Sequence, residues 1–333
     1  MFHFDYNKAF DLIPRNILFA LAEHLGFCPN LLQVMKHMYT NLQRYFRVPG
    51  GVSPAFRSTC GILQGCPLSV VFMNLIISVW ARAIEAETDA LPRAFADDSM
   101  VLAKDIKTAK HACNITGAFA TITGQELAAK KTMAWSTLKS SRTALRKVSL
   151  HGHLLNVFLD IKSLGAQLCS SNIRTVSHYS QRICDAIRIA NNVSSLPISS
   201  TDRGQVCATK ILPKVLYSSE ISAPSFPERG RLRSAITRAV WCKRSSRSAD
   251  VVLSLLHPVH RVDPAAAWAH LCLRQLRRMC LRRPDLVMLI RSLWESPCTK
   301  SKFGPITSAK RALDFWVGPG LSLKFLFLQL DPL

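Results

Sequence analysis

The stretch Ala94-Phe95-Ala96-Asp97-Asp98-Ser99-Met100-Val101-Leu102 consists of two short apolar runs separated by a pair of acids. This pattern predicts a β-hairpin with Asp97 and Asp98 at its tip. Adjacent carboxylates repel each other and lose solvation when they are half-buried, so a fold rarely keeps them at a strand tip without a cation. The pair indicates a divalent-ion site; a solvated Asp-Asp turn is the plain alternative.

A third carboxylate stands close to the amino terminus. Residues 2–6, Phe-His-Phe-Asp-Tyr, alternate between apolar and polar side chains, as a short strand does. Asp5, at the end of this strand, is the candidate that completes a hard oxygen site for Mg²⁺ with Asp97 and Asp98. Two such ions about 4 Å apart can hold the attacking and leaving oxygens of a phosphoryl transfer.

Composition narrows the class of protein and of partner. The 333 residues are 48% hydrophobic, which excludes disorder throughout and leaves room for one large or two ordinary domains. The net charge of +22 favours a polyanionic partner, nucleic acid above all. The 11 cysteines are scattered without a CxxC pair, which indicates reduced thiols in a nuclear or cytoplasmic chain. The apolar stretch 68–81 contains polar residues and is expected to be too short and too polar to span a membrane.

Hydrophobic spacing predicts the other elements of the chain. Helices are expected over 14–26, from a cap at Asn30, and over 67–87 and 106–122. Strands are expected over 44–48 and 131–135. Beyond about residue 165 the strand signals fade, and the chain is expected to be mainly helical and rich in Arg.

Four blocks of the sequence resemble, in order, the motifs of the reverse transcriptase domain of non-LTR (LINE-type) retrotransposons. These are Asp5-Tyr-Asn-Lys-Ala-Phe-Asp11, Gly61-Ile-Leu-Gln-Gly-Cys-Pro-Leu-Ser69, Phe95-Ala-Asp-Asp98 and Gly124-Gln-Glu-Leu-Ala-Ala-Lys-Lys-Thr132. A weaker block, Ser163-Leu164-Gly165, resembles the family's primer grip. The resemblance covers roughly residues 1–170. It implies an RNA-directed DNA polymerase that adds dNTPs to the 3′-hydroxyl of a DNA primer on an RNA template.

The resemblance also implies which residues carry the metal and select the nucleotide. Asp5 and Asp97 would hold two Mg²⁺ ions, with Mn²⁺ a possible substitute, and Asp98 would complete the cluster. Phe10 would be the aromatic gate that excludes a ribonucleotide 2′-hydroxyl; a core Phe is the alternative. Lys131 would approach the triphosphate and neutralise or protonate the departing pyrophosphate.

The second and fourth blocks leave alternatives open. Gln64 would hydrogen-bond near the nucleotide or template, and Gly65 would let the backbone approach the templating base pair; a helix-entry turn before Pro67 is the alternative for both. Lys130 competes with Lys131 for the pyrophosphate. Asp11 is expected to be a helix N-cap rather than a ligand.

The expected fold is α+β: a polymerase palm, with a small antiparallel sheet packed on helices, over residues 1–168, and a basic, helical, thumb-like region over 169–333. The family's upstream fingers and endonuclease are not recognisable, which predicts a truncated piece of a retroelement protein. Two other readings remain. One is a non-catalytic nucleic-acid-binding remnant, because the net charge of +22 persists in a truncated chain even where catalysis is lost. The other is a group II intron maturase, which shares the palm and often carries Tyr-Ala-Asp-Asp.

Overall fold

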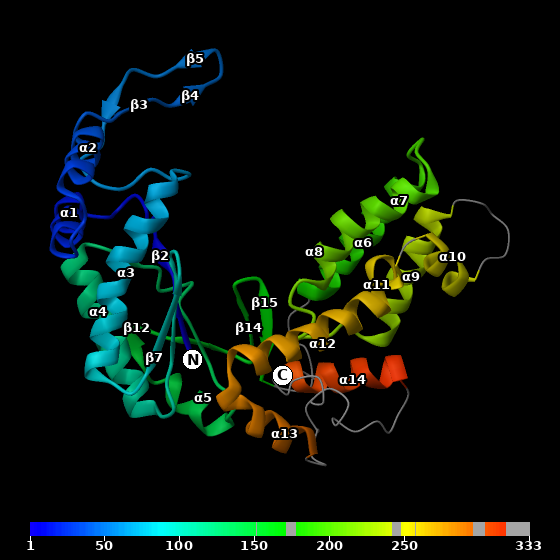
Figure 1. Cartoon of the computed structure of the whole chain (residues 1–333). Coiled ribbons are helices and arrows are strands. Elements are labelled where there is room, and N and C mark those ends of the chain that lie inside the picture. Colours follow the sequence, from blue (N-terminus) through cyan, green and yellow to red (C-terminus); the bar gives the residue numbers. More distant parts are fainter. Residues whose placement is uncertain (151, 171–177, 242–247, 257, 296–303, 318–333) are drawn as a thin grey trace. The chain divides into compact units, whose positions relative to one another are not determined.

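The computed structural model describes residues 1–150, 152–170, 178–241, 248–256, 258–295 and 304–317 (Figure 1). The chain divides into two compact units, unit 1 over Met1–Phe158 and unit 2 over Leu159–Leu333. Unit 1 is mixed α and β, and the described part of unit 2 is helical apart from one hairpin. The α+β class expected from the sequence is confirmed. The boundary between the units lies after residue 158, whereas the sequence analysis expected it after residue 168.

A five-stranded sheet organises unit 1. Its order is β13-β10-β1-β8-β7, and every neighbouring pair is antiparallel except β10 and β13. The elements of unit 1 are β1 (Phe2–Phe4), β2 (Tyr6–Asn7), α1 (Arg15–His24), α2 (Pro29–Thr40), β3 (Gln43–Arg44), β4 (Arg47–Val48), β5 (Gly51–Val52), β6 (Phe56–Arg57), α3 (Pro67–Glu87), β7 (Leu91–Phe95), β8 (Asp98–Leu102), α4 (Ile106–Thr123), β9 (Glu126–Leu127), β10 (Met133–Trp135), α5 (Lys139–Leu145), β11 (Ser149–Leu150), β12 (His153–Leu154) and β13 (Asn156–Phe158).

Helices α3 and α4 pack against each other and against the strands of this sheet. The Trp80 ring of α3 meets Phe4 of β1 edge-on, and its indole N–H donates to the Thr116 hydroxyl of α4 at 3.0 Å. The Asp105 carboxylate accepts the Thr108 amide at the start of α4, and Gly124 ends that helix. The apolar faces of strand and helices thus share one core, and this core fixes the central strand β1 in place.

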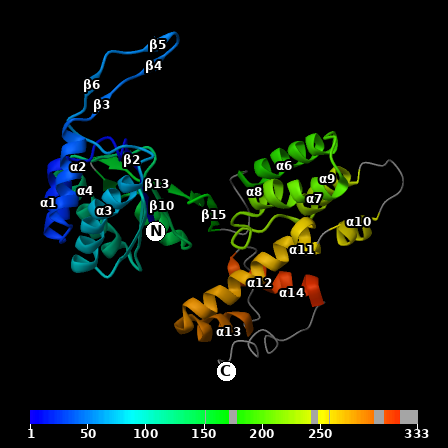
Figure 2. The same ribbon diagram turned by 45° about the horizontal axis from the view of Figure 1, so that its top comes forward.

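A long hairpin projects from unit 1 after α2, and Figure 2 shows it extending away from the helices. Strands β3 and β6 pair at its base and β4 and β5 near its tip, where Gly50 has φ +88°. The single strand expected over 44–48 is therefore two short strands. The rings of Phe46 and Phe56 stack with centroids 4.8 Å apart.

Two local expectations in the first half of the chain need correction. Asn30 lies inside α2, which begins at Pro29 after Cys28 and has no side-chain cap. Helix α1 buries Leu18, Phe19 and Ala22, whereas the apolar spacing of the sequence indicates a face of Leu18, Ala20, Leu21 and Leu25, of which Ala20 and Leu25 are exposed. Helix α3 has the expected bounds, and the whole helix, which is longer than the apolar segment 68–81, is long and apolar enough to cross a membrane by length and composition. Core helices pass the same test, and one face of α3 lies in the core described above.

Unit 2 is built from helices, as the sequence predicted for the region after residue 165. Its described elements are β14 (Asp160–Ser163), β15 (Ala166–Cys169), α6 (His178–Ser194), α7 (Ser200–Val206), the π-helical turn η1 (Cys207–Ile211), α8 (Leu212–Leu216), α9 (Phe226–Val240), α10 (Ala249–Leu256), α11 (Val259–Val262), α12 (Pro264–Arg282), the 3-10 turn η2 (Pro284–Leu286), α13 (Val287–Glu295) and α14 (Pro305–Val317). Trp268 of α12, 1% exposed, is the largest side chain in its main core. Unit 2 therefore has a hydrophobic core of its own.

Candidate active site

The strand register brings the amino-terminal acid to the acidic hairpin. Strands β1 and β8 are antiparallel, with Phe4 opposite Ser99. Asp5 directly follows β1, at the same end of the pairing at which Asp98 begins β8, so the chain brings the two residues to the same end of the sheet. Strands β7 and β8 form the predicted hairpin, and Asp97 lies in its two-residue turn after Ala96, whose φ is +54°.

The three carboxylates have different partners. Oδ2 of Asp5 lies 3.6 Å from Nζ of Lys131, and Oδ1 of Asp98 lies 3.5 Å from Nε2 of the buried His3. Asp97 is exposed; its backbone carbonyl accepts a hydrogen bond from the Ser99 hydroxyl at 3.5 Å, but its carboxylate has no hydrogen bond or ion pair within the part of the chain that the structure describes. Among the described residues, no three His, Cys, Asp or Glu side chains are grouped so that they could hold a metal. The backbone thus brings the acids to one end of the sheet, where the carboxylate of Asp5 lies beside Lys131 and that of Asp98 beside His3.

The first two motif blocks are in direct backbone contact. The amide of Gly61 donates to the Ile13 carbonyl, and the amide of Ile62 donates to the Phe10 carbonyl, both at 2.8 Å. A Cβ on Gly61 would lie 2.5 Å from the carbonyl oxygen of Asp11. Only glycine permits this approach and the φ of +81° that goes with it. Phe10 is half-buried and packs against the core of unit 1, which leaves both the gate and the core interpretation open.

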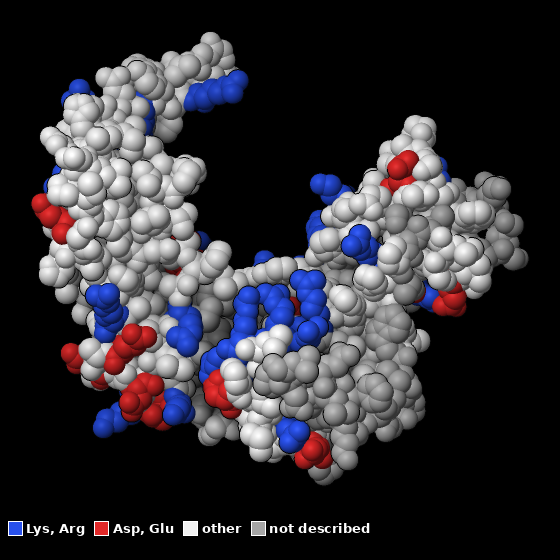
Figure 3. All heavy atoms as spheres, viewed as in Figure 1, with Lys and Arg blue, Asp and Glu red and all other residues white. Residues whose placement is uncertain are grey.

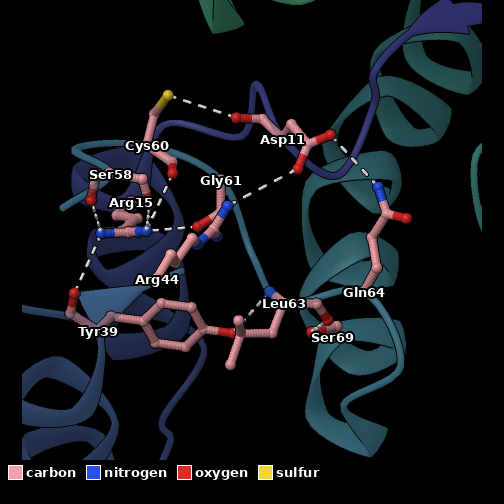
Figure 4. Close-up of polar contacts among 10 residues, drawn as sticks. All are labelled: Asp11, Arg15, Tyr39, Arg44, Ser58, Cys60, Gly61, Leu63, Gln64 and Ser69. Atoms are coloured by element: carbon pink, nitrogen blue, oxygen red, sulfur yellow. Dashed lines mark hydrogen bonds and ion pairs between the residues drawn. The ribbon is translucent and has the colours of Figure 1, made fainter. Parts of the chain in front are cut away.

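Arg15 holds the loop before α3, as Figure 4 shows. Its guanidinium donates to the carbonyls of Gly61, Tyr39, Ser58 and Cys60 and to the Ser58 hydroxyl, at 2.7 to 3.1 Å. Burial, and then the nearby Arg44 charge, lower the pKa of this guanidinium. A planar group with five donors can join several carbonyls that an ammonium group could not reach together. Arg15 therefore fixes the second motif block to α1.

Asp11 does not cap a helix, in contrast to the expectation. Helix α1 begins after Pro14 without a side-chain cap. The Asp11 carboxylate instead accepts a hydrogen bond from Gln64 Nε2 at 3.3 Å and lies 4.0 Å from Arg44 (Figure 4). Pro14 itself occupies the N-cap position and has no side-chain acceptor, and Asp11 lies three residues before it. Asp11 thus positions Gln64.

Gly65 is exposed and has φ +87°, and a Cβ there would meet nothing within 4 Å. Its conformation requires glycine although its surroundings do not. The neighbouring Gln64 is also exposed, apart from its bond to Asp11. Both residues predicted to contact nucleotide or template are therefore accessible. Whether they bind either ligand stays a prediction.

The fourth block is bonded to the segment that carries Asp5. Strands β2 and β9 pair with Tyr6 opposite Leu127, and the Ala128 amide donates to the Asp5 carbonyl at 2.8 Å. The turn that follows directs Lys131 to Asp5, whereas the backbone carbonyl of Lys130 accepts a bond from Asn156. Of the two lysines, Lys131 is thus the one whose side chain lies beside Asp5, and its role toward the pyrophosphate stays a prediction.

Sequence reasoning missed two residues of this region. His3 is 6% exposed and lies beside Asp98, and its Nδ1 has no hydrogen-bond partner in the described structure. The signal available was its position two residues before Asp5, which places both on one face of a strand. Arg15 gave no signal at all, because a single Arg after a Pro has no distinctive pattern. Burial also raises the pKa of Tyr6, the residue after Asp5.

The weak block Ser163-Leu164-Gly165 forms the turn of the β14–β15 hairpin in unit 2. Arg182 of α6 donates to the Gly165 carbonyl at 2.7 Å, and the Tyr217 hydroxyl donates to the Leu164 carbonyl at 2.7 Å. The turn is thus fixed to the helices of its own unit. Its assignment as a primer grip stays a prediction.

Comparison with known proteins agrees with the motif order. A solved structure of telomerase from Candida albicans, in complex with a TWJ fragment of telomeric RNA, aligns with 77% of this chain at 11% identity and a TM-score of 0.40, and the alignment covers 51% of the telomerase chain. This chain thus spans about half the length of that protein, and a likeness of this size adds nothing to the assignment. The model of the family described as reverse transcriptase (RNA-dependent DNA polymerase) matches residues 1–167, half of the chain. The four motif blocks all lie inside this match, and the chain belongs to the reverse transcriptase family.

Proposed function

We propose that this chain is the RNA-directed DNA polymerase part of a non-LTR retroelement protein. Its substrates are dNTPs, an RNA template and the 3′-hydroxyl of a DNA primer. The observation that supports the proposal is the β1–β8 pairing, which brings the end of β1, directly before Asp5, beside the start of β8 at Asp98 in a chain of the reverse transcriptase family. The Lys8-Ala9-Phe10-Asp11 wording and Phe95 in the acidic hairpin favour a retrotransposon over an intron maturase.

The acids have the donor chemistry that Mg²⁺ requires. Asp5, Asp97 and Asp98 offer carboxylate oxygens, the ligands that this hard cation prefers, and the carboxylate of Asp97 is exposed and unpartnered in the described structure. Two ions bound there would neutralise charge on the triphosphate and align the primer hydroxyl. The side chains of Asp5 and Asp98 would then leave Lys131 and His3, because an oxygen of each carboxylate now lies 3.6 and 3.5 Å, respectively, from a nitrogen of these side chains.

Lys131 would have a role of its own once Asp5 binds a metal ion instead of the lysine. Its side chain is 66% exposed and lies beside the acids, so its ammonium group is available to the triphosphate. We assign to it the neutralisation or protonation of the departing pyrophosphate, a general-acid role. His3 takes a positioning role, since it approaches Asp98 from within the core.

Primer extension on poly(rA)/oligo(dT) with Mg²⁺ tests this proposal. We expect Asp97→Asn to lower dTMP incorporation by about a thousandfold, since the charge stabilisation supplied through a metal ligand is worth several kcal/mol. Asp89→Asn is the matched control, because Asp89 is an exposed acid just before the same hairpin. Equal activity of the two variants would contradict the assignment of Asp97.

Binding without incorporation is the outcome that favours the remnant reading. If the unaltered chain binds the template–primer but incorporates nothing, even with a fingers segment supplied in trans, the polymerase proposal fails. The carboxylates of Asp5 and Asp98 lie beside Lys131 and His3 rather than beside each other, and this observation keeps the non-catalytic reading open. Splicing of a cognate intron would instead identify a maturase.

A further inference from the structure

The ion pair between Asp5 and Lys131 joins the segment that carries an acid of the proposed metal site to the last motif block. Oδ2 of Asp5 lies 3.6 Å from Nζ of Lys131. The Asp5 side chain is 31% exposed and the Lys131 side chain 66% exposed, so ligands in solution can reach both ends of the pair. Each end suits one component of nucleotide transfer, because a carboxylate binds a metal cation and an ammonium group binds a phosphate.

Ion pairs are common on the surface of this protein, so the distance alone is not informative. The chain has 43 Lys and Arg against 21 Asp and Glu, and Figure 3 shows acids of unit 1 directly beside basic side chains. An exposed pair of this kind contributes little to stability. Two further observations distinguish the pair of Asp5 and Lys131 from an ordinary surface contact.

The first observation is that the backbone holds Lys131 next to Asp5 whether or not the side chains touch. The Ala128 amide donates to the Asp5 carbonyl at 2.8 Å, and the amides of Lys131 and Thr132 both donate to the Ala128 carbonyl at 2.9 Å. Thr132 is fully buried, so the turn is anchored in the core directly after Lys131. A Lys131 side chain that leaves Asp5 therefore stays within reach of the acids.

The second observation is that the other two acids have no exchangeable partner of this kind. Nε2 of His3 lies 3.5 Å from Oδ1 of Asp98, but His3 is only 6% exposed, so its imidazole does not turn toward a ligand in solution. The carboxylate of Asp97 has no partner in the described structure. Within that structure, Asp5 is thus the one acid of the three whose partner can itself bind substrate.

We propose that the pair of Asp5 and Lys131 couples the binding of metal to the binding of nucleotide, an inference that rests on the proposed function. Lys131 must leave Asp5 when a cation binds there, because the two positive charges repel each other. Lys131 must also leave Asp5 in order to reach the triphosphate. The ligand that binds first therefore breaks the pair, and the second ligand binds without that cost. The pair opposes each ligand alone and favours the two together, and by thermodynamic linkage this coupling is equal in both directions.

Binding of Mn²⁺ in the absence of nucleotide, measured from the EPR signal of the free ion, tests the acidic end of the pair. We expect Lys131→Gln to bind Mn²⁺ about threefold to fivefold more tightly than the unaltered chain, because a partly exposed ion pair no longer competes. Lys130→Gln is the matched control, since it removes the adjacent lysine and leaves the one beside Asp5. Its affinity should stay close to that of the unaltered chain. Equal affinities in the two variants would overturn the proposal.

Binding of a fluorescent dTTP analogue in EDTA tests the basic end of the pair without metal. We expect Asp5→Asn to raise the affinity, because it frees Lys131 and also removes a charge that repels phosphate. The double variant Asp5→Asn/Lys131→Gln separates these two effects. Compared with Lys131→Gln alone, its gain should be about threefold to fivefold smaller than the gain of Asp5→Asn in the unaltered chain. Equal gains in the two backgrounds would show that Asp5 acts by repulsion only, and the proposal would be overturned.

Both measurements can be separated from the test of the polymerase assignment, because neither requires incorporation. An inactive chain that shows both shifts would refute the polymerase and leave the coupling in place. A chain that extends the primer but lacks either shift would refute the coupling and leave the polymerase in place. Absence of Mn²⁺ binding in every variant would overturn the metal site and the coupling together.

Discussion

The carbonyl oxygen of Asp11 lies 2.5 Å from the point where a Cβ atom on Gly61 would stand. This contact joins the first motif block, which carries Asp5, to the loop that leads to Gln64 and Gly65. At this point the two blocks are in contact through main-chain atoms, in addition to the side-chain hydrogen bond between Gln64 and Asp11. A substitution at Gly61 must move a backbone segment rather than a flexible side chain.

A comparison of Gly61→Ala with Gly65→Ala should separate the cost of the positive φ from the cost of the clash with Asp11. Both glycines have positive φ, so each variant pays about 1 kcal/mol or more for the left-handed conformation. Only Gly61→Ala adds the clash with Asp11, and we expect its free energy of unfolding to fall by a further ~2 kcal/mol or more. Urea midpoints of the two variants measure the difference, and equal midpoints would show that the loop yields freely.

Arg15→Lys should loosen the loop over residues 58–61. An ammonium group cannot make the five hydrogen bonds of the guanidinium, and the freed carbonyls are partly buried. We expect a loss of about 2 to 4 kcal/mol in local stability. Hydrogen exchange at the Ile62 amide is the measurement. Arg82→Lys, at an exposed position of α3, is the control and should leave that amide protected. Unchanged protection in Arg15→Lys would contradict the clamp.

Lys131→Gln should slow the chemical step of nucleotide addition. If Lys131 protonates the departing pyrophosphate, single-turnover rates fall by about a hundredfold and lose part of their pH dependence. Lys130→Gln is the neighbouring control, and it should stay near the rate of the unaltered chain because Lys131 is the lysine beside Asp5. Larger loss in Lys130→Gln would transfer the role to that residue.

Arg233 of unit 2 bridges two acids of very different exposure. It donates to Asp263, which is 3% exposed and caps α12, and to Asp250, whose side chain is 81% exposed. We expect Asp263→Asn to cost about 3 kcal/mol because it leaves a partly buried guanidinium without its main partner, and Asp250→Asn to cost less than about 1 kcal/mol. Thermal unfolding of the full chain compares the two. Equal shifts would contradict the burial argument.

The same bridge sets a pH dependence in the acid range. The hydrogen bond from Arg233, and then its charge, lower the pKa of Asp250 below 3.8. Stability from this pair is therefore present above that value and is lost as the pH falls through the lower pKa of the folded state. The unfolding midpoints of the unaltered chain and of Asp250→Asn should converge as the pH falls through this lowered pKa. A difference between the two unfolding midpoints that widens as the pH falls would contradict the expected lowering of the Asp250 pKa.

The sequence alone was enough to predict the α+β class, the acidic hairpin, the helices of residues 67–87 and 106–122, and the family. These rest on local signals: the two apolar runs around Asp97-Asp98, the hydrophobic spacing of the two helices, and four motifs in order. Each depends on residues adjacent in the chain, so a linear pattern records it.

Tertiary structure alone decided which side chains meet. The pairing of Lys131 rather than Lys130 with Asp5, the turn of Asp11 toward Gln64, the five bonds of Arg15 and the place of His3 beside Asp98 all join segments far apart in the chain. Such contacts depend on strand register and helix packing, which follow from the burial of whole faces in a shared core and leave no signature at a single position.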